Sequence, residues 1–152
     1  MSEDIKRKVK VKLIHRDALM PKYHTDGAAA FDLQVMLNRC CDTLMPGHPV
    51  VYSTGIALAI PEGFVGIMAI RSGKGINEGL KLSSQVDIID SDFRGEISLP
   101  LYTDRPNGCS IEHGERVAQM VIVPVDQVEF EQVEELPETA RGTGGLGHTG
   151  KN

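Results

Sequence analysis

Lys8-Val-Lys-Val-Lys-Leu-Ile14 alternates charged and apolar residues almost without exception. Successive side chains of a β-strand point to opposite faces, so this spacing places Val9, Val11 and Leu13 on one face. The intervening lysines then face solvent. The segment therefore predicts a strand with one buried and one exposed face.

Outward from this strand, short apolar runs recur at residues 50–60, 65–70, 97–102, 117–125 and 128–133. Each run is bounded by Gly, Pro, Asn or Asp, the residues that form turns between strands. Helical periodicity is nearly absent. We therefore expect an all-β domain of short strands, arranged as a jelly-roll-like barrel or sandwich.

The composition fits a single globular domain. The chain has 152 residues, of which 41% are hydrophobic and 24% charged, and it is long enough to bury a sizeable core. These values disfavour a disordered chain, a collagen-like chain and a disulfide scaffold. The formal net charge of -5 gives no electrostatic footprint for a nucleic-acid polymer. A small anionic ligand is still compatible with this charge if basic groups converge locally.

The compartment is predicted from the N-terminal residues and the cysteines. The first residues carry mixed charge, and neither a signal peptide nor a membrane span is apparent. Cys40 and Cys41 are adjacent and Cys109 stands alone, which matches neither a disulfide framework nor a zinc site. The five histidines are scattered, and no pair has the helical spacing of metal ligands. We expect a cytoplasmic protein, or one of the host cytoplasm if a phage encodes it.

Two segments bring charged groups next to apolar runs. Arg71-Ser-Gly-Lys-Gly75 follows an apolar strand, and it reads equally well as a surface turn or as an anion-binding turn. Asp87-Ile-Ile-Asp-Ser-Asp-Phe-Arg-Gly-Glu96 packs four carboxylates around two isoleucines. In the functional interpretation, Asp90 is partly desolvated by Ile88 and Ile89 and deprotonates a water molecule. The alternative is a polar hairpin turn with surface ion pairs.

The C-terminal segment Arg141-Gly-Thr-Gly-Gly-Leu-Gly-His-Thr-Gly150 contains five glycines in ten residues. It cannot hold a regular element by itself, and its composition alone is that of a disordered tail. Backbone N–H groups and the guanidinium of Arg141 are also able to wrap phosphate oxygens. We expect a β domain over residues 1–138 and a mobile glycine-rich arm over residues 139–152 that closes the active site.

Five segments, in this order, resemble the motifs of the trimeric dUTPase (dUTP diphosphatase) family. They are Ala28-Ala-Ala-Phe-Asp-Leu33, Arg71-Ser-Gly73, Ile89-Asp-Ser-Asp-Phe-Arg-Gly-Glu96, Gly114-Glu-Arg-Val-Ala-Gln119 and the tail 141–150. The likeness covers nearly the whole chain. It implies a β jelly roll, a homotrimer with active sites at subunit interfaces, and Mg²⁺-dependent hydrolysis of dUTP to dUMP and pyrophosphate. Such a reaction lowers dUTP and supplies dUMP for dTMP synthesis.

The resemblance also implies roles for individual residues. Asp90 is the general base that activates the water attacking the α-phosphorus. Mg²⁺ is held by substrate oxygens and water, so no protein metal ligand is assigned. The residues implied in phosphate and substrate binding are Arg71, Ser72, Gly73, Gln119, Arg141, Gly144, Gly145, Leu146 and Gly147, with the tail supplied by a different subunit. Those implied at the nucleoside are Ser84, Asp87, Ile89 and Phe93.

The nucleoside-facing residues depart from the family pattern. Phe93 replaces a tyrosine that packs under the deoxyribose, and Ser84 replaces an asparagine that reads the uracil edge. Asp87 stands where glycine is common, and Leu146 replaces a phenylalanine that stacks over the base. An altered base selectivity, towards a modified dUTP or another dNTP, is therefore an alternative to dUTP itself.

Two further alternatives concern the type of protein. One is the related dCTP deaminase branch, whose general layout this chain does not share. The other is a non-catalytic relative that binds a protein partner. The match of the aspartate motif counts against the deaminase branch, and the presence of Asp90, Arg71, Ser72, Gln119 and Arg141 argues against a loss of catalysis.

Overall fold

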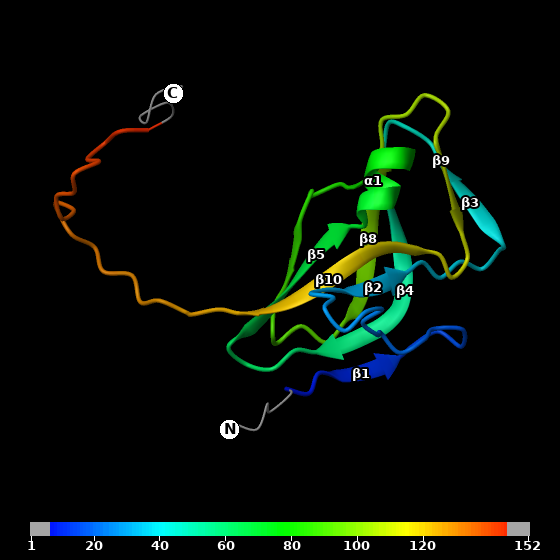
Figure 1. The fold of residues 1–152 in the computed structure, drawn as a ribbon, viewed down its shortest axis with the longest axis horizontal. Helices are drawn as coiled ribbons and strands as arrows, with labels where there is room; N and C mark the ends of the chain where they lie inside the picture. Colours follow the sequence, from blue (N-terminus) through cyan, green and yellow to red (C-terminus); the bar gives the residue numbers. More distant parts are fainter. Residues whose placement is uncertain (1–6, 146–152) are drawn as a thin grey trace.

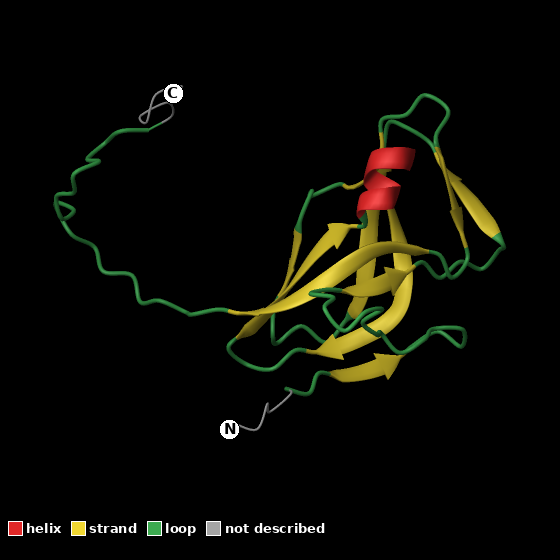
Figure 2. Ribbon diagram, in the orientation of Figure 1, coloured by secondary structure: helices red, strands yellow, loops and turns green. Residues whose placement is uncertain are grey.

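Short strands are the main regular elements of residues 7–145, the part of the chain described by the computed structural model (Figures 1 and 2). In chain order the elements are β1 (Lys10–Leu13), β2 (Phe31–Gln34), β3 (Cys41–Leu44), β4 (Val50–Ala59), β5 (Phe64–Ile70), α1 (Ser72–Glu78), β6 (Leu80–Leu82), β7 (Asp87–Ile89), β8 (Glu96–Thr103), β9 (Cys109–Glu112) and β10 (Arg116–Pro124). The all-β, jelly-roll-like fold expected from the sequence is confirmed.

The strands form two four-stranded antiparallel sheets and a separate ribbon. One sheet has the order β1-β4-β8-β6, and the other has the order β2-β10-β5-β7. Strands β3 and β9 form a two-stranded ribbon at one end of the body (Figure 2). Because β7 lies in one sheet and β8 in the other, the segment around Asp90 crosses between sheets and is not the hairpin considered above.

Apolar alternation produces the core. In β8 the residues Ile97, Leu99, Leu101 and Thr103 are buried, while the residues between them are exposed or half-buried. A single cluster of buried residues draws on both sheets and on the ribbon. The sequence pattern therefore fixes which face of each strand points inward.

The N-terminal strand keeps its predicted face only in part. Val9 and Val11 pack against the core, whereas Leu13 is 44% exposed. The strand pairing ends at this point, because the backbone N–H groups of Ile14 and His15 both donate to the carbonyl oxygen of Gly55. Gly55 adopts a φ of 70° within a register shift of β4, and the chain turns away there.

Two sequence expectations about elements were wrong. Residues 128–133 are not a strand, although their apolar residues resemble one, and Phe130 is 93% exposed. A strand needs a neighbour for its backbone hydrogen bonds, and the described chain offers none to this segment. Residues 125–145 instead run away from the body (Figure 1). Conversely, residues 72–78 form helix α1, which is too short to cross a membrane.

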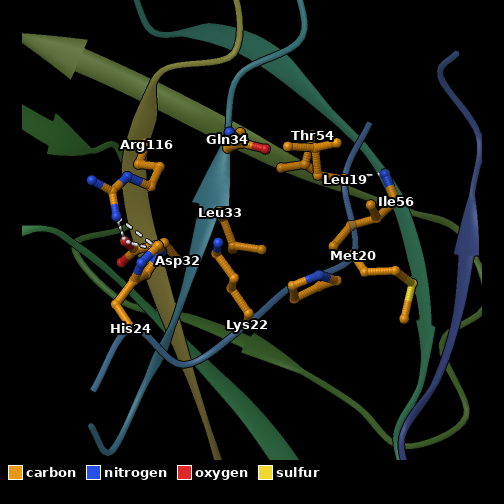
Figure 3. Close-up of a pocket in the computed structure, with 11 residues that line it drawn as sticks. Leu19, Met20, Lys22, His24, Asp32, Leu33, Gln34, Thr54, Ile56 and Arg116 are labelled. Atoms are coloured by element: carbon orange, nitrogen blue, oxygen red, sulfur yellow. Dashed lines mark hydrogen bonds and ion pairs between the residues drawn. The ribbon is translucent and has the colours of Figure 1, made fainter. Parts of the chain in front are cut away.

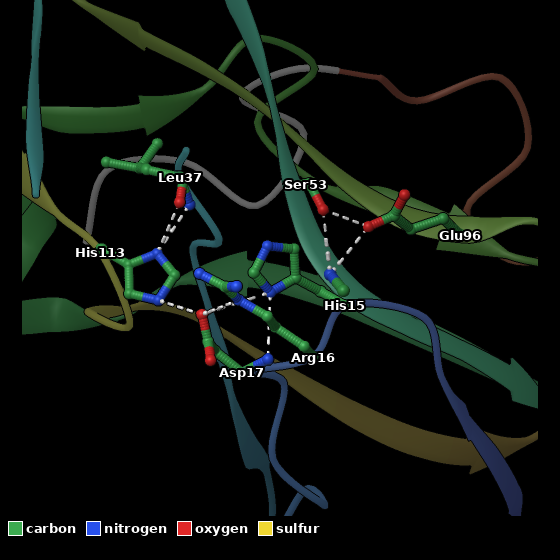
Figure 4. A network of polar contacts seen from close by, with 8 residues as sticks. His15, Arg16, Asp17, Leu37, Ser53, Glu96 and His113 are labelled. Carbon is green, nitrogen blue, oxygen red and sulfur yellow. Dashed lines mark hydrogen bonds and ion pairs between the residues drawn. The ribbon is translucent and has the colours of Figure 1, made fainter. Parts of the chain in front are cut away.

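Polar contacts fix the connections that surround the sheets. Tyr52 of β4 donates to Asp42 Oδ2 of the ribbon at 3.0 Å, and burial together with this carboxylate raises the pKa of Tyr52 to about 12. The β1–β2 loop is held by Asp17, which lies 3.5 Å from His113 Nε2 (Figure 4). His113 in turn contacts the backbone of Leu37 through Nδ1. The loop that follows β1 is thereby tied to the β9–β10 turn.

Candidate functional site

The arginine of the Arg71-Ser-Gly73 segment lies at the junction of β5 and α1. Its backbone N–H donates to Val117 O at 3.0 Å, and its Nη1 donates to Arg116 O at 3.1 Å. Both acceptors belong to β10, the central neighbour of β5 in the sheet. Ser72 and Gly73 are exposed at the start of the helix. Strand pairing therefore holds Arg71 and leaves its two neighbours facing solvent.

Asp32 of β2 joins two arginines. Its Oδ1 lies 3.2 Å from Arg71 Nε. Its Oδ2 lies 3.1 Å from Arg116 Nη1, the pair drawn in Figure 3. The Asp32 side chain is only 13% exposed. Asp32 is also directly opposite Gln119 in the β2–β10 pairing. A partly buried carboxylate thus holds two guanidinium groups beside the amide of Gln119.

These groups surround a hollow of about 280 Å³. Its lining consists of His24, Ala28, Ala30, Asp32, Arg71, Ser72, Gly73, Arg116 and Gln119. All four phosphate-binding residues predicted from the body of the chain, Arg71, Ser72, Gly73 and Gln119, are therefore brought together. Two cations, a hydroxyl and an amide in one hollow suit a small anion with several oxygen atoms.

The hollow sits beside an unusual buried lysine. Lys74 of α1 is 9% exposed, and its Nζ lies 2.6 Å from Glu78 Oε2 and also contacts Glu115 Oε1. Burial alone would lower the pKa of Lys74, but hydrogen bonds to Glu115 and Glu78 raise it. The ammonium group therefore stays charged and ties α1 to the turn before β10.

Asp90 is far from this hollow within one chain. Ile89 pairs with Gly66 near the start of β5, whereas Arg71 follows the last residue of that strand. About six strand residues at roughly 3.3 Å each separate the two positions by about 20 Å. Asp90 is also exposed, so the desolvation expected from Ile88 and Ile89 is absent in the single chain. Ile88 itself is 58% exposed.

The predicted nucleoside residues lie on β7 and in the loops on either side of it, in the same stretch of chain as Asp90. Ser84 lies in the loop between β6 and β7, Asp87 is the first residue of β7, and the Ser84 hydroxyl donates to Asp87 Oδ1. Gln85 between them has a φ of 67°. Ile89 is half-buried, and Phe93 is 43% exposed. Two substitutions noted in the sequence, Ser84 and Asp87, are therefore partners in one hydrogen bond.

The tail residues that the structure describes, up to Gly145, do not reach the hollow. Arg141 is exposed, and its Nε donates to Gly144 O at 2.8 Å within the tail itself. Gly145 is exposed as well. Leu146 and Gly147 lie outside the described residues. Residues 125–145 lead away from the body in Figure 1.

Three residues of the hollow with ionisable side chains were given no role by the sequence reasoning. Asp32 and Arg116 lie inside segments that were recognised, and their opposite charges in neighbouring strands were the available signal. His24 was counted only as a scattered histidine, and nothing in its spacing points to Arg116. Within residues 7–145 no group of three His, Cys, Asp or Glu side chains could hold a metal ion.

An all-β fold with a cation-lined hollow at its strand ends, followed by a glycine-rich tail, defines a class of jelly-roll-like proteins that bind small anions. Comparison with known proteins makes the class specific. The dUTPase family model matches residues 16–150. The chain belongs to the dUTPase family.

Relatives and solved structures agree with this assignment. A deoxyuridine 5'-triphosphate nucleotidohydrolase of Acinetobacter baumannii is 43% identical over 149 residues, covering 95% of this chain and 99% of the relative. The enzyme of the same name from Alcanivorax borkumensis is 42% identical, and the match covers 87% of this chain and 88% of the relative. The structure of the Staphylococcus bacteriophage 80alpha dUTPase with dUPNHPP matches this chain with a TM-score of 0.83 and 28% identity. The match covers 95% of this chain and 99% of the phage protein.

Proposed function

We propose that this protein hydrolyses dUTP to dUMP and pyrophosphate through attack of water on the α-phosphorus. The observation that carries the proposal is the hollow in which Arg71, Arg116 and Gln119 converge beside Ser72 and Gly73. The named relatives act on the same substrate. The reaction lowers dUTP and supplies dUMP for dTMP synthesis. We place it in the cytoplasm, in keeping with these bacterial relatives.

The residues of the hollow hold the phosphate chain. Arg71 is oriented by Asp32 and by its hydrogen bond to Arg116 O, so its guanidinium needs little reorganisation when an anion enters. Ser72 and Gln119 add a hydroxyl and an amide donor. Binding the pyrophosphate portion in this way orients the α-phosphorus for an in-line attack by water.

Asp90 acts as the general base, and it does so at an interface between subunits. The separation of about 20 Å along β5 prevents one chain from supplying both Asp90 and Arg71 to one substrate. A second copy that presents its Asp90 segment to this hollow completes the site. Exposed Ile88 and Phe93 beside Asp90 supply apolar surface for that contact and for its desolvation. We therefore propose a homotrimer with three shared sites.

The tail completes the site from another subunit. We propose that residues 139–152 close over the bound nucleotide, with Arg141, Gly144 and Gly145 at the phosphates and with Leu146 and Gly147 in the part not described. The exposed apolar residues before the tail, Val128, Phe130, Val133 and Leu136, support docking of this segment on another copy. Closure of this kind excludes water other than the attacking molecule.

Mg²⁺ fits this site as a companion of the substrate. Both carboxylate oxygens of Asp32 are taken by arginines, and residues 7–145 contain no three-ligand cluster. An ion that keeps its water shell and binds phosphate oxygens needs no such cluster. When bound, Mg²⁺ neutralises charge on the triphosphate. A related phage phi11 dUTPase, 25% identical with a TM-score of 0.76, is described with a structural Mg(II) ion.

A second candidate concerns the base. The Ser84 hydroxyl donates to Asp87, so the segment from Ser84 to Asp87 presents a carboxylate acceptor where the family pattern has an amide that both donates and accepts. A carboxylate favours a base edge that donates hydrogen bonds. This observation supports a selectivity that extends beyond dUTP to modified dUTP or another dNTP.

Pyrophosphate release from a panel of nucleotides tests both candidates. With dUTP, 5-substituted dUTP, dTTP, dCTP and UTP, we expect the highest kcat/KM for dUTP and rejection of UTP. Absence of dUTP hydrolysis would contradict the proposed function. Higher kcat/KM for another dNTP would establish the second candidate, and a Ser84→Asn/Asp87→Gly double variant should then shift the preference back to dUTP.

A further inference from the structure

His24 occupies a distinctive place at the edge of the hollow. It lies on the β1–β2 loop, and its side chain is 39% exposed. Its Nε2 is 2.9 Å from Arg116 Nη1 and 3.4 Å from Asp32 Oδ2. Arg116 Nη1 is in turn 3.1 Å from Asp32 Oδ2 (Figure 3). Three atoms with different hydrogen-bonding abilities thus form a triangle.

The chemistry of arginine decides the state of the imidazole. A guanidinium only donates hydrogen bonds, so His24 Nε2 must accept from Arg116 and carries no proton in this arrangement. The ring proton of neutral His24 then lies on Nδ1. The two hydrogens of Arg116 Nη1 are shared between Asp32 Oδ2 and His24 Nε2. Neutral His24 therefore fixes the direction of this guanidinium.

Protonation would reverse the role of Nε2. Histidine is the side chain that ordinarily changes charge between about pH 5 and 8. With a proton on Nε2, both Nε2 and Arg116 Nη1 would be donors, so they could no longer form a hydrogen bond with each other. The Nε2–H group would donate to Asp32 Oδ2 instead. The charge of His24, Asp32, Arg71 and Arg116 together would rise from one positive to two, whichever way Arg116 then turned.

We propose that His24 is a positioning residue for Arg116 and that its imidazole couples binding of the phosphate chain to pH. The proposal rests on the proposed function, because it needs a polyanion in the hollow. An added positive charge beside a polyanion strengthens its binding, and this attraction outweighs the single hydrogen bond that Arg116 loses when His24 is protonated. The affinity for dUTP therefore rises as His24 gains a proton.

The charged neighbours of His24 come from several elements. Asp32 lies on β2, Arg116 on β10, and Arg71 reaches the same carboxylate from the β5–α1 junction. Lys22 shares the loop and, with His24, lines an adjoining cavity of about 190 Å³ (Figure 3). The loop is also anchored through His113 and Asp17, so other histidines contribute to any pH profile. Matched variants are needed to isolate His24.

Two substitutions at His24 distinguish its role as a hydrogen-bond acceptor from its ability to gain a proton. His24→Gln keeps a side-chain oxygen that accepts from Arg116 but cannot gain a proton, whereas His24→Ala removes the acceptor. The control is His48→Ala, an exposed histidine in the turn before β4. KM and kcat for dUTP are measured for the full-length proteins at pH 8 and pH 6.

At pH 8 we expect KM to rise about fivefold in His24→Ala, and to stay within about twofold of wild type in His24→Gln and His48→Ala. Between pH 8 and pH 6 the KM of wild type should fall about threefold to tenfold relative to His24→Gln, since the titration of the substrate itself cancels in this ratio. His48→Ala should follow wild type.

Equal pH profiles for wild type and His24→Gln would overturn the proposal. Imidazole ¹⁵N shifts, with the His24 signals assigned by their loss in His24→Gln, give a readout independent of turnover. We expect the Nδ1–H tautomer at pH 8, and an Nε2–H tautomer would also overturn it. If wild type released no pyrophosphate from dUTP while the ¹⁵N shifts were as expected, the proposed function would fail and the arrangement of His24 would stand.

Discussion

Asp90 has little in its own chain to determine its chemistry. It is exposed, it follows β7, and the arginines of the hollow lie at the other end of β5. Its proposed role as a base therefore depends on what a second subunit brings to it. This dependence separates Asp90 from residues that act through contacts within one chain.

Replacing Asp90 by asparagine should reduce kcat for dUTP by about 10²-fold to 10⁴-fold, because the amide keeps the shape of the side chain but cannot accept a proton. KM should change little, since the phosphate-binding groups are untouched. Asp92→Asn is the matched control, as Asp92 is an exposed carboxylate in the same segment. Pyrophosphate release under saturating dUTP measures the effect. Turnover near wild type in Asp90→Asn would remove Asp90 from the mechanism.

Single residues were predicted best where they lie in segments that resemble the motifs of the family. Arg71, Ser72, Gly73 and Gln119 were assigned to one ligand and do line one hollow. Asp32 was missed because its importance comes from strand register: pairing with β10 brings it to Gln119, and sheet order brings it to Arg71. Register and sheet order are long-range properties that one segment of sequence does not contain.

Among the elements, β4 depends on a single glycine. Gly55 has a φ of 70°, and a Cβ added there would lie 2.7 Å from His15 Cβ and 2.9 Å from Ala18 Cβ. The glycine lets the β1–β2 loop pack directly on the strand. Gly63 has a similar φ of 77° but has no atom within 4 Å of an added Cβ.

Gly55 and Gly63 together allow the cost of a steric clash to be distinguished from the cost of backbone strain. Gly63→Ala should lower the free energy of unfolding by about 1 kcal/mol, from backbone strain alone. Gly55→Ala adds a steric clash and should lower it by about 3 kcal/mol or more. Urea unfolding followed by circular dichroism measures both. Equal losses would show that the loop yields to the added methyl group.

Elements were predicted correctly where the apolar pattern had a partner strand. The run 97–102 became β8 because β4 and β6 flank it, whereas residues 128–133 carry a comparable pattern and have no flanking strand in the described chain. Helix α1 was missed because Gly73 and Gly75 are poor helix formers. The ion pairs of Lys74 and a left-handed Gly79 after the last turn hold the helix in place.

At the scale of the whole molecule, the functional groups are divided over three regions. The hollow, the Asp90 segment and the described part of the tail lie apart in the single chain, although the sequence motifs assign them to one reaction. Several exposed apolar residues fall on the parts that the proposed assembly brings together, with Ile88 and Phe93 near Asp90 and Phe130 before the tail. An assembly of several copies reconciles the motifs with this separation.

Two truncations test how the tail and the segment before it divide these tasks. Deletion of residues 139–152 removes Arg141 and the glycines but keeps Val128, Phe130, Val133 and Leu136, so the trimer should persist in sedimentation while kcat falls at least about 100-fold. Deletion of residues 126–152 also removes that apolar surface. The proposed trimer should then dissociate at higher protein concentrations than the trimer of the full-length protein does. Unchanged kcat in the shorter deletion would leave the tail without a role in closure. Loss of the trimer in that deletion would instead place the contacts between subunits in the glycine-rich residues, where few side chains are available to make them.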